Sequence, residues 1–384
     1  MWQRASSIVS NIRKLWNADK TFTAPQEARI AVIDATNVKV IEPLFRNEPY
    51  EVVDIEWRKL YLTIGIACST VKHLWYVRRL KVAYIAALLD QIRPAIAVTF
   101  IDNGALFQQV SRYYGKVRFL AVQNGSRLLD RDNPPGSPPI FHTEFACLGR
   151  YEIDQYARHG AQVQKYYPVG SLKDSYYRAR YGQALQQKRF DICLVSQVRI
   201  GLTRRFGKQL DAFAVLTGHV RQFCQEYSKT LCVALRKHPE SARREFEWEY
   251  AWFREQLGEV PELFPNVKDE YTSYQLMDQS LVSIGMHSTV MREGFGRHNR
   301  ILSCNFTDDP VYSFPVDGIW ALNDSEYSSF EKRVLALLNV TDPEYAAMIG
   351  EWPEYLIGYD CKCPTYEFLG NLIAEAVRGV PAPQ

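Results

Sequence analysis

The chain has 384 residues, of which 47% are hydrophobic and 23% are charged, and its formal net charge is +3. These proportions are typical of globular proteins and exclude a disordered or fibrous chain, and the length predicts two domains. A charge so close to neutral also argues against a nucleic-acid-binding protein.

The first 22 residues lack the continuous apolar core of a secretory signal and are amphipathic instead. Trp2, Ile8 and Leu15 can share one helix face, with Arg13 and Lys14 beside it. Such a helix either packs on the body of the protein or makes a peripheral contact with an anionic membrane surface. No apolar stretch reaches the roughly 20 residues of a membrane span. The eight scattered cysteines favour free thiols in a reducing cytoplasm.

Apolar runs and helix-like stretches alternate in the first half of the chain. Strands are expected at Arg29–Asp34, Glu51–Ile55, Ala95–Phe100 and Val117–Val122, and a helix at Trp75–Ile92. Continuous apolar strands separated by helices predict a parallel sheet that is covered on both faces. The Pro- and Gly-rich segment Asp130–Pro139 is a loop beyond a strand's carboxyl end, where open α/β sheets place their ligand crevices.

The second half repeats this alternation after a polar stretch, Tyr181–Arg189, that is suited to link two domains. Strands are expected at Asp191–Ser196, Leu231–Leu235, Leu281–Ile284 and Ile301–Cys304, and helices at Gln209–Tyr227, Tyr274–Gln279, Thr289–Phe295 and Glu367–Val377. We therefore predict an N-terminal lobe over 1–188, a C-terminal lobe over 189–350, and a final helix and tail over 351–384 that pack back on the first lobe.

The segment Leu281–Cys304 runs from a strand through Gly285 to a helix start at Ser288-Thr289. Free N–H groups and the positive end of the helix dipole at such a start bind phosphate, and Glu293, one turn in, could accept from ribose hydroxyls. An ordinary N-cap after a Gly-containing turn gives the same pattern, so both interpretations stay open. Arg236–Glu240 follows a strand of the same lobe, so both segments should converge on one crevice.

The order of several short motifs resembles a family. Lys237-His-Pro-Glu240, followed by His287-Ser-Thr-Val-Met-Arg-Glu293, resembles the HP and S-T-x-x-x-E motifs of two-lobed bacterial glycosyltransferases that build surface carbohydrate, including Kdo-type and sialic-acid-type transferases. The first half adds motifs that resemble the same family, namely Ile41–Phe45, Val53-Asp54, Ile92–Pro94, Thr99–Asn103, Ala121–Gly125, Leu148-Gly149 and Tyr167–Ser171.

The resemblance implies a GT-B fold, in which two Rossmann-like, doubly wound lobes face a central cleft. It places a donor nucleotide on the C-terminal lobe, at Ser196, Gln197, Arg236, Lys237, His238, Pro239, His287, Ser288, Thr289 and Glu293. It also implies that no metal or other cofactor is needed, because cations and helix starts meet the phosphate. The segment Leu281–Cys304 lacks the acidic E-x-x-x-x-x-x-E donor motif, which favours a CMP-activated ulosonic acid such as Kdo over a UDP- or GDP-hexose.

Catalytic carboxylates are then expected on crevice loops of the N-terminal lobe. Glu144 and Asp102 are the first candidates, before Asp34, and either could act as base or nucleophile at the anomeric carbon. A turn-stabilising or surface role for each acid is the alternative. The side chains expected to hold sugar oxygens are those of Gln123, Asn124, Arg127 and His142.

The leading hypothesis is a transferase for lipopolysaccharide, O-antigen or capsule, with a CMP-sugar donor and a saccharide or lipid-linked saccharide acceptor. A UDP- or GDP-hexose transferase or a polyol-phosphate transferase on the same fold is an alternative. A non-catalytic partner of a polysaccharide assembly complex is another.

Overall fold

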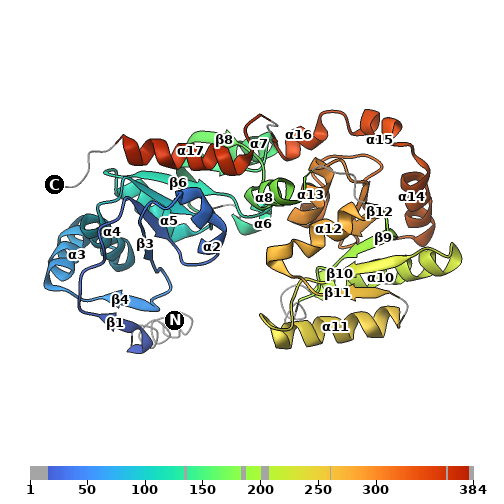
Figure 1. Cartoon of the computed structure of the whole chain (residues 1–384), viewed down its shortest axis with the longest axis horizontal. Coiled ribbons are helices and arrows are strands. Elements are labelled where there is room, and N and C mark those ends of the chain that lie inside the picture. The colour runs from blue at the N-terminus through green and yellow to red at the C-terminus, as the bar shows by residue number, and fades with distance from the viewer. Residues whose placement is uncertain are drawn as a thin grey trace.

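The computed structural model describes residues 16–133, 136–182, 187–199, 207–259, 261–359 and 362–379. Two lobes lie side by side, and each is built on a six-stranded sheet with helices on both faces (Figure 1). Every strand pair in these sheets is parallel. The predicted α/β class with two doubly wound parallel sheets is therefore confirmed.

The sheet of the first lobe has the order β3-β2-β5-β6-β7-β8. Its strands are β2 (Ile30–Ile33), β3 (Tyr50–Val53), β5 (Ile96–Thr99), β6 (Arg118–Val122), β7 (Phe141–Cys147) and β8 (Gln162–Pro168). Strands β2 and β5 are buried at every position, as expected for continuous apolar runs at the centre of a parallel sheet. A small separate ribbon pairs β1 (Asp19–Thr21) with β4 (Lys59–Tyr61).

The sheet of the second lobe has the order β11-β10-β9-β12-β13-β14. Its strands are β9 (Phe190–Val195), β10 (Leu231–Ala234), β11 (Glu262–Phe264), β12 (Ser280–Gly285), β13 (Ile301–Cys304) and β14 (Ala321–Leu322). The chain winds outward from β9 to β11, then returns to β12 on the other side of β9. Open α/β sheets bind ligands outside the carboxyl ends of the strands at such a reversal, here between β9 and β12.

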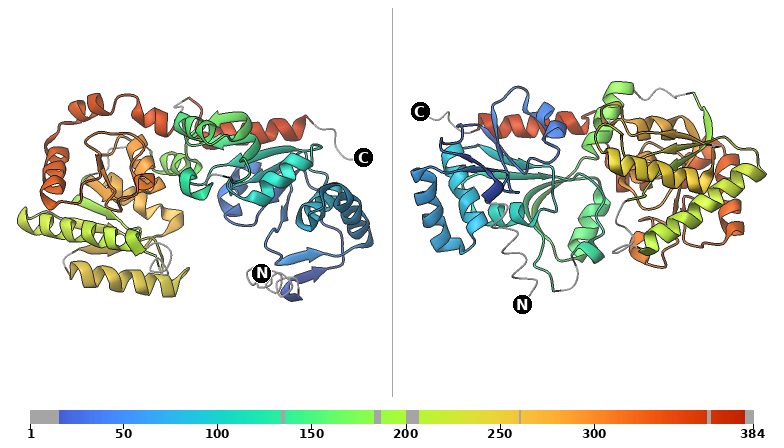
Figure 2. Two further views of the ribbon diagram at one scale, coloured as in Figure 1. Left: turned by 180° about the vertical axis from the view of Figure 1, so that it is seen from behind. Right: turned by 90° about the horizontal axis from the view of Figure 1, so that it is seen from below.

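Helices cover both faces of each sheet (Figure 2). The first lobe has α2 (Val38–Ile41), η1 (Glu42–Phe45), α3 (Ile64–Val77), α4 (Leu80–Ile92), α5 (Ala105–Tyr113), α6 (Leu129–Asp132), α7 (Arg150–Arg158) and α8 (Leu172–Tyr181). The second lobe has α10 (Gly207–Glu226), α11 (Arg243–Leu257), η2 (Lys268–Glu270), α12 (Thr272–Asp278), α13 (Thr289–Gly296), η3 (Pro310–Tyr312), α14 (Tyr327–Asn339) and α15 (Asp342–Ile349).

The last two helices lead the chain back to the first lobe (Figure 1). After α16 (Trp352–Leu356), α17 (Thr365–Arg378) lies along the first sheet. Leu369 and Ile373 of α17 belong to the same buried cluster as Ile30 and Val98 of the sheet. One face of the N-terminal sheet is thus covered by α17 together with α2, η1 and α8, while α4 and α5 cover the other face.

One expected helix is in fact two. The segment predicted as a helix over Trp75–Ile92 belongs to α3 and α4, which meet at Arg78. Arg78 ends α3 in the left-handed conformation, with φ of 51°. The apolar spacing continues through both helices, so the periodicity alone did not reveal this break.

Parts of the sequence predictions fall outside the described residues. These are most of the amphipathic start, residues 183–186 of the expected linker, Pro134-Pro135 of the crevice loop, and the end of the tail. Among the residues that are described, no helix combines the length and apolar character needed to cross a bilayer.

Candidate functional site

A cavity of about 870 Å³ opens between the two lobes. It lies at the carboxyl ends of strands from both sheets. Residues from the first lobe that line it are Asn103, Gly125, Ser126, Arg127, Leu128, Arg131 and Asp132. Residues from the second lobe are Ser196, Gln197, Arg199, Gln209, Arg236, Met286, His287, Ser288, Thr289 and Tyr312.

The C-terminal rim of the cavity is made by the loops that follow β9, β10 and β12. Ser196 directly follows β9, and Arg236 comes shortly after the end of β10. Ser288 is the N-cap of α13, with extended backbone and without a capping hydrogen bond from its side chain. The Ser288 hydroxyl therefore remains available at a helix start, which favours binding of an anion.

Glu249 holds the loops of this rim together from below. Its buried carboxylate accepts hydrogen bonds from the Ser196 hydroxyl, from the N–H of Arg236 at 2.9 Å and from the N–H of Lys237 at 3.1 Å. Burial raises the pKa of Glu249, an effect that these donors oppose. Glu249 was not predicted as a site residue, because the charge-rich segment that forms α11 was not predicted as a helix.

Positive charge dominates the cavity wall. Arg131, Arg199 and Arg236 line it, and among its described residues only Asp132 has a carboxylate, which pairs with Arg131 at 3.0 Å. Burial and then the charge of Arg199 lower the pKa of Arg236 to about 10. Because these surroundings disfavour the positive charge of Arg236, an anion bound beside it would be stabilised.

The same positive charges act on His287. Burial lowers its pKa to about 4, and the charges of Arg131, Arg199 and Arg292 act in the same direction. The imidazole is therefore neutral at pH 7 and can accept a proton. An anion beside it would raise its pKa again.

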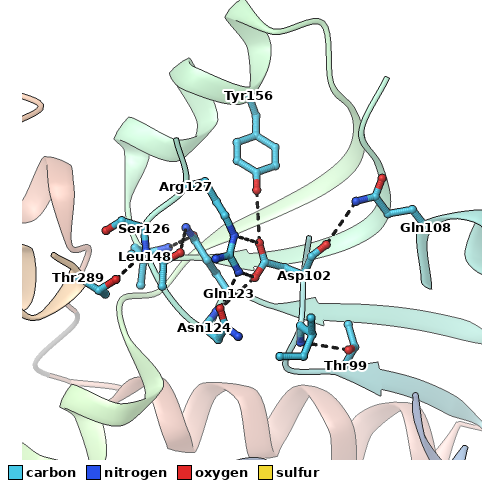
Figure 3. A network of polar contacts seen from close by, with 12 residues as sticks. Thr99, Asp102, Gln108, Gln123, Asn124, Ser126, Arg127, Leu148, Tyr156 and Thr289 are labelled. Carbon is cyan, nitrogen blue, oxygen red and sulfur yellow. Dashed lines mark hydrogen bonds and ion pairs between the residues drawn. The ribbon is translucent and has the colours of Figure 1, made fainter. Parts of the chain in front are cut away.

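The N-terminal rim is organised around a buried ion pair (Figure 3). The fully buried carboxylate of Asp102 pairs with the guanidinium of Arg127, whose Nε lies 2.9 Å from Oδ2. The N–H of Asn124 and the hydroxyl of Tyr156 also donate to this carboxylate, at 3.3 and 3.4 Å. Arg127 donates in turn to the side chain of Asn124 at 2.6 Å. Asp102 thus fixes the loop that carries Arg127 to the cavity.

The two rims are in contact at the start of α13. The N–H of Ser126 donates to the hydroxyl of Thr289 at 2.8 Å, and a Cβ at Gly125 would lie only 2.9 Å from that oxygen. Arg292 donates to the Ser126 hydroxyl at 3.2 Å and to the buried carboxylate of Glu152 at 2.8 Å. The start of α13 is therefore both a wall of the cavity and part of the joint between the lobes.

Several expected site residues meet at this cavity and others do not. Of the set predicted for the nucleotide, the structure brings together Ser196, Gln197, Arg236, His287, Ser288 and Thr289. Lys237, His238 and Pro239 do not line the cavity, and the ring of His238 accepts from the N–H of Glu240 at 3.3 Å. The loop turns after Arg236, so only its first residue points inward.

Glu293 is turned away from the cavity. It is buried, accepts from the hydroxyls of Ser171 and Tyr274, and lies one helical turn below the rim. The prediction that it contacts a ribose is therefore wrong: its carboxylate ties α13 to α8 and α12. A sequence spacing of one turn places a side chain on the same helix, but it does not decide what that side of the helix faces.

Glu144 does not lie on a crevice loop as expected. It is in strand β7, where its carboxylate pairs with Arg118 and accepts from the Tyr167 hydroxyl at 2.6 Å. The Arg118 guanidinium and this hydroxyl hold the pKa of Glu144 below its ordinary value. β7 begins at Phe141, shortly after the expected loop, so Glu144 lies within the strand and not on a crevice loop.

The residues expected to hold sugar oxygens also serve mainly the interior of the first lobe. Of these four only Arg127 lines the cavity. Gln123 accepts from the N–H of Leu148 at 2.9 Å and donates to the carbonyl of Gly125 at 3.0 Å, so it shapes the loop. His142 is fully buried and stacks on Phe145 with ring centroids 4.8 Å apart.

Four charged or aromatic residues that line the cavity were not predicted from the sequence, namely Arg131, Asp132, Arg199 and Tyr312. Arg131 and Asp132 lie in the segment predicted as a crevice loop, so its position was the available signal. Tyr312 is reached only through the fold, where its hydroxyl accepts from Arg131 at 3.1 Å. Within the described part of the chain, no three His, Cys, Asp or Glu side chains group as metal ligands would.

No family model and no curated protein matches the chain in sequence. Its fold is similar to that of solved structures. The UDP-GlcNAc 2-epimerase of Methanocaldococcus jannaschii, solved with UDP-GlcNAc and UDP, matches with 12% identity and a TM-score of 0.51, over 90% of this chain and 99% of that one.

A protein from Listeria monocytogenes described as a UDP-N-acetylglucosamine 2-epimerase matches with 15% identity and a TM-score of 0.52, over 93% of this chain and 98% of that one. The wall teichoic acid polymerase TagF matches with 11% identity and a TM-score of 0.50, over 92% of this chain and 89% of that one. At such identities the likeness is one of fold. Two Rossmann-like lobes about a cleft are the GT-B fold, so this prediction is confirmed.

Proposed function

We propose that the protein is a glycosyltransferase that binds a nucleotide-activated sugar in the cavity between its lobes. The observation that carries this proposal is the cluster of Arg131, Arg199 and Arg236 around a helix start, at the carboxyl ends of two facing sheets. Cations and helix N-termini are the groups that bind phosphate in proteins. The names of the fold neighbours support a sugar-nucleotide ligand, because they act on UDP-sugars or polymerise teichoic acid.

In this proposal the C-terminal rim binds the donor. Arg236, Ser288 and Thr289 meet the phosphate, and Ser196 and Gln197 face the nucleoside. Arg199 lies on the same rim, Arg131 lies across from them on the first lobe, and these two arginines meet a second negative charge. The arginines take the place of a metal ion, so the reaction proceeds without one.

The carboxylate suited to catalysis is Asp132, which lines the cavity from the first lobe. Asp132 or the neutral ring of His287 accepts the proton of the acceptor hydroxyl while that oxygen bonds to the anomeric carbon and the bond from the sugar to phosphate breaks. General bases of this kind contribute about 10²- to 10⁴-fold to rate. Asp102 and Glu144 have positioning and structural roles instead, since neither lines the cavity and both are held in ion pairs inside the first lobe.

A CMP-activated ulosonic acid is the donor we favour. Such a donor has one phosphate and one carboxylate, and the cavity offers cations on both of its rims. The acceptor is then a saccharide or lipid-linked saccharide of bacterial surface polysaccharide. UDP- or GDP-hexose and polyol-phosphate donors are alternatives for the same rim.

Isothermal titration with CMP, UDP and GDP tests the donor. We expect binding of CMP to the wild type and loss of binding in Arg236→Ala, with Lys237→Ala, outside the cavity, as the matched control. Preferential binding of UDP or GDP would replace the CMP donor, and absence of binding by all three would favour a non-catalytic partner protein.

Transfer assays with the preferred donor test the chemistry. Asp132→Asn and His287→Asn should bind the nucleotide like the wild type, and at least one should lower kcat by about a hundredfold or more. Glu144→Gln serves as the control and should retain kcat. Full activity of both cavity variants would contradict the catalytic assignment.

A sugar-nucleotide epimerase is a second candidate, because two fold neighbours carry that activity in their names and match over nearly their whole length. Incubation with UDP-GlcNAc alone distinguishes the two. An epimerase converts the sugar nucleotide without an acceptor, whereas a transferase leaves it intact until an acceptor hydroxyl is supplied.

A further inference from the structure

Helix α3 carries its apolar residues on the side that faces solvent. Ile64, Val71 and Trp75 are 84, 68 and 83% exposed, and Cys68 is exposed as well. The positions i, i+4, i+7 and i+11 form one stripe along a helix. A surface helix of a globular protein ordinarily turns such a stripe inward, towards the core.

The inner side of α3 combines Ile66, which packs in the core, with polar contacts. The Ser69 hydroxyl donates to the carboxylate of Asp90 on α4 at 2.9 Å, and His73 Nε2 lies 2.7 Å from the same carboxylate. His73 Nδ1 lies 2.8 Å from the hydroxyl of Tyr113 on α5. Contacts to a buried polar cluster therefore anchor α3, and its apolar stripe is left for another surface.

The exposed apolar surface extends beyond the helix at both ends. Phe22 and Leu62 lie side by side at one end, since the N–H of Leu62 donates to the carbonyl of Thr21 at 2.7 Å. Tyr76 and Leu80 continue it at the other end, and both are exposed. Contiguous apolar patches on a protein surface mark sites where another surface binds.

The position of α3 excludes the second lobe as that surface. α3 lies at the end of the first lobe farthest from the second lobe (Figures 1 and 2). Its stripe is thus separate from the cavity and from the joint between the lobes.

The charges that the chain carries on α3 and on either side of it have one sign, since the contacting carboxylate of Asp90 belongs to α4 on the inner side. Residues 57–89 contain six Lys and Arg and no Asp or Glu. Arg58 pairs with Asp54, and Lys59 and Lys81 lie over the rings of Tyr61 and Trp57. The exposed cations on α3 and just after it are Lys72, Arg78 and Arg79.

We propose that the outer face of α3 docks on the surface of an anionic lipid bilayer. Trp and Tyr favour the headgroup level of a membrane, and small apolar side chains insert just below it. Lys and Arg beside them are attracted to anionic lipid. The acid-free charge distribution favours this occupant over a protein partner, whose surface mixes both signs. This contact goes beyond the proposed transferase function and does not depend on it.

Sedimentation of the whole protein with vesicles tests the proposal. We expect binding to vesicles of phosphatidylcholine mixed with phosphatidylglycerol, weaker binding as salt is raised, and little binding to phosphatidylcholine alone. Lys72→Ala combined with Arg79→Ala should lower partitioning by about tenfold or more. Trp75→Ala combined with Val71→Ser should lower it by a similar factor through the apolar contact.

Met348→Ser is the matched control, because Met348 is an exposed apolar residue of the other lobe, on α15. It should bind vesicles like the wild type, and all variants should keep the wild-type melting temperature, since their side chains are exposed. Equal binding by wild type and α3 variants would overturn the proposal. Absence of vesicle binding would also overturn the proposal. A dimer that does not bind vesicles and that Trp75→Ala dissociates would assign the α3 face to a second copy of the chain instead.

Discussion

The two rims of the cavity lie at equivalent edges of similar sheets, yet they balance charge differently. In the first lobe, Asp102 is fully buried and Arg127 neutralises it, with Asn124 and Tyr156 completing its hydrogen bonds. In the second lobe, the guanidinium of Arg236 donates to the carbonyl of Val198 at 3.1 Å and otherwise lines the cavity. Position at a strand's carboxyl end therefore does not by itself identify a binding residue: Asp102 and Arg127 use their charges mainly on each other, whereas Arg236 presents its charge to the cavity.

The largest effect is expected from breaking the internal pair of the first rim. Asp102→Ala leaves Arg127 buried without its partner, which should lower the free energy of unfolding by about 3–5 kcal/mol. Urea unfolding measures this loss. Combining Asp102→Ala with Arg127→Met removes both charges and should recover most of the stability. A loss below about 1 kcal/mol in the single variant would show that the pair is not structural.

A change on the second rim should affect binding without stability. Arg236→Ala removes a charge-assisted contact with the ligand, worth about 1.5–3 kcal/mol, so the Kd for the nucleotide should rise by about 10- to 100-fold. The urea midpoint should stay close to that of the wild type. Titration calorimetry and unfolding of the same preparation measure both. A large loss of stability with unchanged Kd would remove the contrast between the rims.

His142 gives the first lobe a predictable sensitivity to acid. Burial lowers the pKa of its ring to about 4, so the folded protein holds it neutral while the unfolded chain takes up a proton near pH 6.5. The stability from His142 is therefore present above about pH 6.5 and is lost as pH falls towards 4, with about 2 kcal/mol lost between pH 7.5 and 5.

His142→Phe should remove that loss, as measured by urea unfolding at both pH values. Nucleotide should not alter the effect, because His142 lies inside the lobe. A pH dependence that is unchanged in His142→Phe would contradict the assignment to His142.

His287 is the contrasting case on the other rim. A bound anion should raise the pKa of His287, so nucleotide binding near pH 5 should take up protons, which calorimetry in buffers of different ionisation enthalpy detects.

The smallest effect on stability is expected at Ser288. Its side chain makes no capping hydrogen bond, so Ser288→Ala should change the free energy of unfolding by less than about 0.5 kcal/mol while weakening nucleotide binding by about three- to tenfold. Thr341→Ala is the matched control, because the Thr341 hydroxyl does cap α15 and its loss should cost about 1 kcal/mol. Equal losses of stability in both would show that Ser288 acts as an ordinary cap.

Much of the fold could be predicted because its central strands are continuous apolar runs. Leu231–Leu235 and Ala95–Phe100, for example, coincide with β10 and β5 to within a residue or so at each end. Less apolar elements were missed: β8 contains Gln162 and Lys165, and α11 is dense with charge, so neither has a clear apolar period.

Only the site residues that lie close to a strand end could be predicted from the sequence. Ser288 and Arg236 each lie within a few residues of a strand, so the loops that carry them have little conformational freedom. Glu293 and Glu144 could not be placed in the same way, because the direction of a side chain depends on what packs beside it. For Glu293 that is Ser171, which is distant in the sequence and becomes a neighbour only through the fold.

The return of α17 to the first lobe has a consequence for synthesis on the ribosome. Arg29 donates to the carbonyl of Val377, 348 positions later in the chain. The second lobe holds nearly all of its own core and can fold as soon as it emerges. The first lobe, although made earlier, has α2, η1 and α8 on one apolar face of its sheet, but the rest of that face stays uncovered until α17 has been translated. The N-terminal lobe is therefore expected to complete its core last.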